Sequence, residues 1–78
     1  MDFFKKRIRQ FQEKKLDEIR SKIQFHEHMK MQLEKKKNEI ENAENAKITK
    51  EIEFNEKMIK VWKNNEKKLR HQMSEMEE

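Results

Sequence analysis

The sequence predicts an all-α fold, a long antiparallel hairpin of two helices with coiled-coil packing. First, the 78 residues include no glycine, proline or cysteine, so glycine turns and disulfides cannot shape the chain. Second, apolar residues recur at coiled-coil spacing. Third, one segment between the periodic stretches lacks large apolar residues. We expect one helical module over residues 1–78, with helices at about 3–41 and 46–77 and a turn at about 42–45.

The expected first helix contains two apolar registers, offset by one residue. The first register consists of Phe4, Ile8 and Phe11. The second consists of Leu16, Ile19, Ile23, Leu33 and Ile40, with His26, Lys30 and Lys37 at its polar positions. An eleven-residue step separates Ile8 from Ile19, and such a step locally relaxes a left-handed supercoil. We expect both registers to lie in the helix seam.

The segment from Glu41 to Lys47 is the expected turn, because the apolar register slips there by one more residue. Asparagine tolerates the left-handed conformation and caps helices well. Asn42 or Asn45 could therefore end the first helix, and Asn45 could cap the second. The alternative is one continuous coiled-coil helix, since the alanine, glutamate and lysine of this segment are good helix formers.

The expected second helix has an unbroken 3.5-residue period, the spacing of a coiled-coil seam. Its apolar seam residues are Ile48, Ile52, Ile59, Trp62, Leu69 and Met73. Asn55 and Glu66 occupy the same stripe. Polar residues at such positions select a register or a partner at a cost in stability.

Each helix also carries a second apolar flank beside its seam. Phe25 and Met29 widen the stripe of the first helix, and Phe54, Met58 and Val61 widen that of the second. A wide apolar face is typical of a helix that contacts more than one neighbour. A hairpin about 57 Å long cannot cover both flanks itself, so we expect a dimer that forms a four-helix bundle. These five flanking residues are the candidate face for a protein partner.

The sequence gives no indication of catalysis, a cofactor or a metal. No hydroxyl nucleophile lies in a motif with a base, and slender helices rarely form a concave pocket. His71 and Glu75 have the i, i+4 spacing of helical metal ligands, but a lone pair of this kind is common. We therefore expect no enzyme.

The net charge of +4 is concentrated near the start of the chain. The basic residues there are Lys5, Lys6, Arg7, Arg9, Lys14 and Lys15. With phenylalanines among them, they are candidates for contact with nucleic acid or an anionic membrane surface. A basic rim around an apolar seam is also ordinary solvated surface.

The functional prediction is a small helical binding protein, a regulator, inhibitor or assembly adaptor, that contacts a protein partner in the cytoplasm. The expected hairpin is similar in size and shape to the small plasmid-copy-control RNA-binding proteins. That resemblance transfers no residue, and it supports the alternative of an RNA- or DNA-binding regulator. The lysine, asparagine and glutamate content suggests an AT-rich genome, and a small single-module chain is typical of a phage, plasmid or small bacterial regulator.

Overall fold

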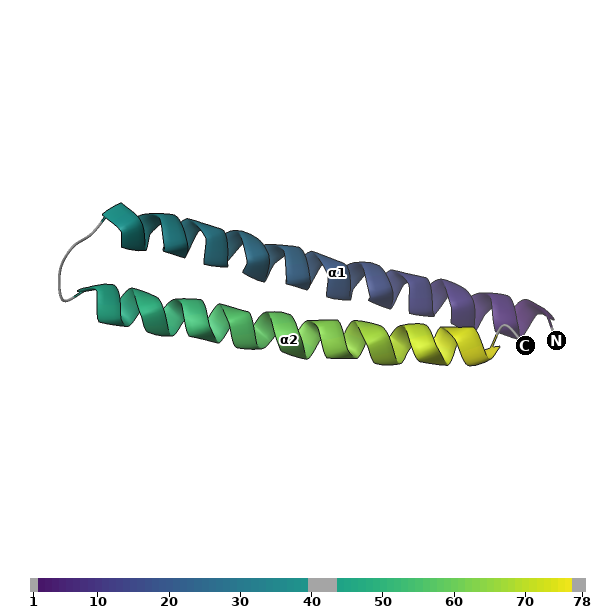
Figure 1. The fold of residues 1–78 in the computed structure, drawn as a ribbon. Coiled ribbons are helices and arrows are strands. Elements are labelled where there is room, and N and C mark those ends of the chain that lie inside the picture. The colour runs from purple at the N-terminus through teal and green to yellow at the C-terminus, as the bar shows by residue number, and fades with distance from the viewer. Residues whose placement is uncertain (1, 40–43, 77–78) are drawn as a thin grey trace.

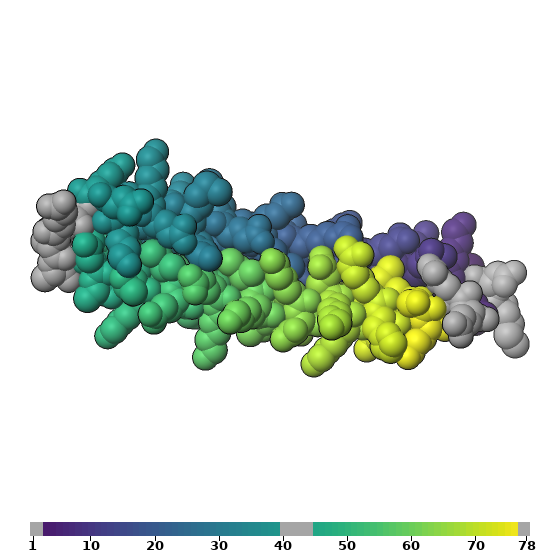
Figure 2. Space-filling model, viewed as in Figure 1, coloured from purple at the N-terminus to yellow at the C-terminus, as the bar shows by residue number. Residues whose placement is uncertain are grey.

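The protein is a hairpin of two long helices that lie side by side. The computed structural model describes residues 2–39 and 44–76, as α1 (Asp2–Glu39) and α2 (Glu44–Met76). Both ends of the chain lie at the same end of the pair (Figure 1). The molecule measures 62 × 14 × 12 Å, and the space-filling view shows the side chains of α1 and α2 in contact along it (Figure 2). The predicted hairpin is confirmed, and the alternative of one continuous helix is wrong.

A narrow apolar seam holds the two helices together. Its buried side chains, each at most 9% exposed, are Leu16, Ile19, Ile23, Leu33, Ile48 and Ile52. The later seam positions Ile59, Trp62, Leu69 and Met73 are half-buried. Burial of apolar area contributes about 25 cal/mol per Å². Two helices alone bury the first set almost fully but shield the later seam side chains only in part, so some apolar surface of the seam stays in water.

Contacts between charged and polar side chains define the antiparallel register. Gln12 meets Met76, with Nε2 of the glutamine donating to the thioether sulfur at 3.4 Å. Farther along, Arg20 pairs with Glu66 at 3.4 Å. Residues early in α1 thus lie opposite residues late in α2, as in antiparallel helices. Among the described residues, no helix is long and apolar enough to cross a membrane.

The first apolar register of α1 does not lie between the two helices. Phe4, Ile8 and Phe11 were expected in the seam, but Phe4 is 69% and Phe11 65% exposed. α2 packs against the face of α1 that carries Leu16 and Ile19. Gln12 lies on that same face and contacts α2. In addition, ten residues of α1 precede Gln12, whereas the described part of α2 ends opposite it. The hairpin therefore leaves this register uncovered.

The helix boundaries differ slightly from the expected ones. Ile40 and Asn42 lie outside the described residues. α2 begins at Glu44, so Asn45 lies inside the helix and its carbonyl accepts a hydrogen bond from Thr49 Oγ1 at 2.8 Å. An N-cap residue needs a non-helical backbone, so the expected cap at Asn45 does not form. Its buried Oδ1 atom has no hydrogen-bond partner.

Candidate protein-binding surface

Charged side chains line one edge of the hairpin, which we call the ion-paired edge. Lys30 Nζ lies 3.4 Å from Glu56 Oε1, and Lys63 Nζ lies 3.7 Å from Glu27 Oε1. Each pair joins α1 to α2. Pairs this exposed contribute only about 0 to 1 kcal/mol each, but together they cover the side of the seam with polar groups.

The seam glutamate Glu66 belongs to the same set of charges. Its Oε2 atom lies 3.4 Å from Arg20 Nε on α1 and 3.9 Å from Arg70 Nη2 on α2. The carboxylate is about one-quarter exposed. Two cations thus compensate a partly buried charge, so a glutamate can occupy a seam position.

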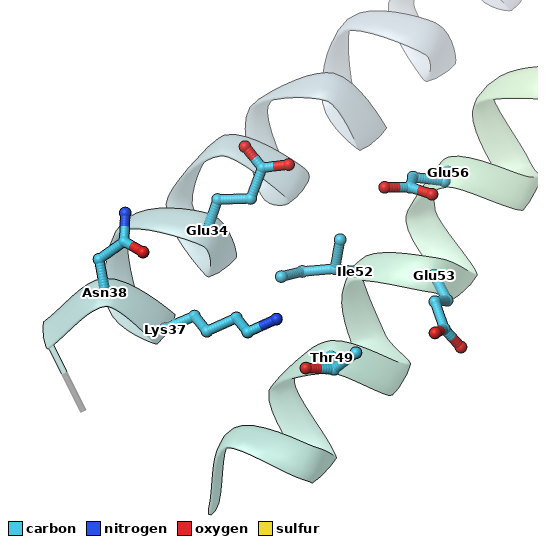
Figure 3. Close-up of a pocket in the computed structure, with 7 residues that line it drawn as sticks. All are labelled: Glu34, Lys37, Asn38, Thr49, Ile52, Glu53 and Glu56. Atoms are coloured by element: carbon cyan, nitrogen blue, oxygen red, sulfur yellow. The ribbon is translucent and has the colours of Figure 1, made fainter. Parts of the chain in front are cut away.

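A shallow groove on this edge is lined mainly by polar side chains (Figure 3). Its lining residues are Glu34, Lys37, Asn38, Thr49, Ile52, Glu53 and Glu56. Lys37 reaches from α1 toward α2 between Ile52 and Thr49, while Glu53 points away from α1 (Figure 3). This groove therefore offers little apolar surface to a partner.

The opposite edge carries an apolar groove that both helices form. Its apolar lining residues are Phe25, Met29 and Leu33 of α1 and Phe54 of α2. The charged residues Lys47, Lys50 and Glu51 of α2 also line it. Phe25 is 59% and Phe54 57% exposed. The structure thus brings together, across the two helices, three of the five residues predicted for a partner face.

Heptad spacing extends this apolar surface along the hairpin. Phe4 and Phe11 precede Phe25 by 21 and 14 residues, which are whole heptads. Residues one heptad apart keep the same position relative to the partner helix. The same spacing relates Ile8 to Met29 and Phe54 to Val61, and Met58 lies one turn from Phe54. We call this set the open edge: Phe4, Ile8, Phe11, Phe25, Met29, Phe54, Met58 and Val61.

A polar pair lies beneath the apolar groove. Asn55 is buried, and its Nδ2 donates to the Glu51 carbonyl at 2.8 Å. Its Oδ1 lies 2.8 Å from His26 Nδ1, so the imidazole donates and the amide accepts. The His26 ring packs edge-on against Phe25 and Phe54, at 5.2 and 6.4 Å between centroids. This pair positions the groove's two phenylalanines. The sequence placed both polar residues in the seam without indicating that they bond.

Lysines lie over aromatic rings near the seam and the open edge. Lys15 Nζ is 5.9 Å from the ring centroid of Phe11, and Lys22 Nζ is 5.0 Å from that of Trp62. Such contacts contribute about 0.5 to 1 kcal/mol at exposed sites. Trp62 is half-buried at its seam position, so it is a weaker anchor for a partner than the exposed phenylalanines.

The basic residues near the start of α1 are all exposed, but they do not share one face. Lys5, Lys6, Arg7, Arg9, Lys14 and Lys15 include neighbours in sequence, which point about 100° apart on a helix. Arg9 Nε lies 3.6 Å from Glu13 Oε1, and Arg7 lies over the Phe3 ring at 5.5 Å. Charge surrounds the helix here and forms no single stripe.

His71 and Glu75 are in contact, with 3.0 Å between Nε2 and Oε1. In residues 2–39 and 44–76, no three histidine, aspartate or glutamate side chains come close enough to hold a metal ion. Their contact is thus a surface pair on α2.

No family model, curated protein or solved structure matches the chain. The open edge is therefore defined by the residues of this chain alone.

Proposed function

We propose that this chain is a non-enzymatic helical binding protein, a small regulator, inhibitor or assembly adaptor, that contacts another protein through the open edge. The observation behind this proposal is the contrast between the edges. Ion pairs cover one side of the seam, whereas Phe25 and Phe54 flank an apolar groove on the other and are each more than half exposed.

The chemistry of the open edge suits protein recognition. Exposed aromatic side chains are the commonest anchors of interfaces. Covering one phenylalanine contributes about 1.5 to 3 kcal/mol. Met29 and Met58 add flexible side chains that adapt to a partner's shape. A groove between paired helices can accept apolar side chains of a further helix.

Partner capture with matched variants tests the proposal. Phe25→Ser with Phe54→Ser alters the open edge, whereas Met31→Ser removes an equally exposed apolar side chain between Glu27 and Glu34 on the ion-paired edge. After nuclease treatment of the native cell extract, we expect the wild type and Met31→Ser to retain the same protein partner. The double variant should lose it. Retention by all three proteins contradicts the proposal.

Nucleic-acid binding is the second candidate, because the six basic residues at the start of α1 are exposed and so is Phe3. Phosphate contacts release counterions, so affinity must fall steeply as salt rises. Titration of RNA and duplex DNA at increasing salt tests this candidate. Weak, salt-independent binding excludes it.

The same basic segment could contact an anionic membrane surface. Each lysine or arginine near such a surface contributes about 1 kcal/mol. Co-sedimentation with vesicles of rising anionic lipid content tests this candidate, and binding unaffected by that content excludes it. A cytoplasmic location and a dimer of hairpins forming a four-helix bundle also belong to the proposal.

A further inference from the structure

The open edge consists of two separate apolar patches. The terminal patch contains Phe4, Ile8 and Phe11. The central patch contains Phe25, Met29 and Phe54, which line the groove, and Met58 and Val61, which follow on α2. Between them on the same helical face lie Lys15, Glu18 and Lys22, which are polar.

The chain cannot cover its own groove with the terminal patch. Phe4 precedes Phe25 by 21 residues within one helix, and this separation corresponds to about 32 Å. The helix holds that distance, so the aromatic side chains of the terminal patch can enter only the groove of another copy.

The spacing of the two patches is self-complementary. Phe11 and Phe25 are 14 residues apart, and Glu18 lies midway at the same heptad position. A two-fold axis near Glu18 therefore sets Phe11 of one chain against Phe25 of the other. We infer that a second copy of this chain docks antiparallel on the open edge, with the terminal patch of each copy in the central groove of the other. This inference rests on the proposed function and names a second copy of the chain as the protein that the open edge contacts.

The same two-fold axis brings Phe4 to the groove. Phe4 lies 14 residues before Glu18 and so reaches the level of Gln32 in the second copy. Leu33, the next residue, lines the groove together with Phe54. The aromatic rings of the terminal patch thus meet the apolar side chains that the hairpin leaves uncovered.

Charges near the axis are compatible with this docking. The two-fold axis sets Glu18 of one copy close to Glu18 of the other, and Lys15 and Lys22 of each copy lie at the levels on either side. Four lysines thus surround the two glutamates and offset their like charges, which favours this register over others.

The apolar area is sufficient for a stable dimer. A phenylalanine side chain buries roughly 200 Å², and the four phenylalanines of the open edge are each more than half exposed. They alone offer roughly 500 Å² per copy. With their apolar neighbours, two copies bury on the order of 1,200 Å² or more, which reaches the range of specific interfaces.

Charge-swap variants test the register. The inferred dimer contains two equivalent contacts between Phe11 of one copy and Phe25 of the other. In a homodimer of Phe11→Glu, or in one of Phe25→Lys, each contact sets a charge against a phenylalanine. Sedimentation equilibrium should show at least about tenfold weaker dimerisation for each variant alone. Mixed in equal amounts, they regain one native contact and one ion pair between the introduced glutamate and the introduced lysine, so a 1:1 heterodimer should form. Failure of the mixture to associate overturns the inferred register.

Cysteine cross-linking tests the axis without altering an aromatic residue, because the chain has no native cysteine. Glu18→Cys should form a disulfide-linked dimer under mild oxidation, and Gln24→Cys, a residue outside the open edge, should not. Equal cross-linking of the two variants contradicts the inference. A wild type that stays monomeric at high micromolar concentration also overturns it. If Phe25→Ser with Phe54→Ser still loses a heterologous partner in that case, the proposed function survives.

Discussion

The two edges of the hairpin arise from the same pair of helices yet present opposite surfaces. Along the ion-paired edge, Lys30 and Lys63 of different helices reach glutamates on the facing helix. Along the open edge, Phe25 and Phe54 flank a groove that no part of the described chain fills. The seam thus sets the pairing of the helices, while the flanks make one side charged and leave apolar side chains exposed on the other.

The seam supports both edges, so its loss should have the largest effect. Ile52→Ala removes a side chain that is only 7% exposed, and comparable truncations cost about 2 to 5 kcal/mol. Urea unfolding followed by circular dichroism should show this loss. Met31→Ala, at an exposed position, should change stability by less than about 0.5 kcal/mol. Equal effects would indicate that the seam is not the core.

The open edge should govern association more than folding of the hairpin. Phe54→Ser removes a largely exposed ring, whose burial in an interface contributes about 1.5 to 3 kcal/mol. We expect the wild-type Tm to rise with protein concentration and the variant's Tm to rise much less. Met31→Ser on the ion-paired edge should keep the concentration dependence. If the Tm of Phe54→Ser rose with protein concentration as steeply as that of the wild type, the two edges would not differ in their role in association.

The hydrogen-bonded pair of His26 and Asn55 lies between the edges, and single and double substitutions should affect it differently. Asn55→Ala leaves His26 Nδ1 without its acceptor, which should cost about 1 to 3 kcal/mol of unfolding free energy. The double variant His26→Leu with Asn55→Leu removes both polar groups and should be nearly neutral. Thermal unfolding of the three proteins measures the difference. A double variant as unstable as Asn55→Ala contradicts this assignment.

The ion-paired edge should show the smallest effect. Glu56→Gln removes the partner of Lys30, with an expected cost of about 0.2 to 1 kcal/mol. That cost should shrink in high salt, because salt screens exposed charges. Urea unfolding at low and high salt measures it. Glu53→Gln is the matched control, since Glu53 points away from α1 (Figure 3). An equal loss of unfolding free energy in this control would argue that the Lys30–Glu56 pair does not contribute to stability.

Sequence spacing predicted most of the architecture but not the outcome for the first turns of α1. The periodic positions Ile19 and Ile52 are buried as expected from their heptads. Phe11 follows an equally regular register, yet it is exposed because Gln12 faces the end of α2 instead. Two registers offset by one residue cannot both face one partner helix, and spacing within α1 does not reveal which register α2 uses.

The order of residues was enough to specify long helices with an apolar stripe and a widened flank, because local periodicity places side chains around each helix axis. It did not specify that Phe25 and Phe54 share one groove or that His26 bonds Asn55, which the pairing of α1 with α2 established. These contacts depend on the axial register and the rotation of one helix relative to the other. Both result from packing between residues that are distant in the chain.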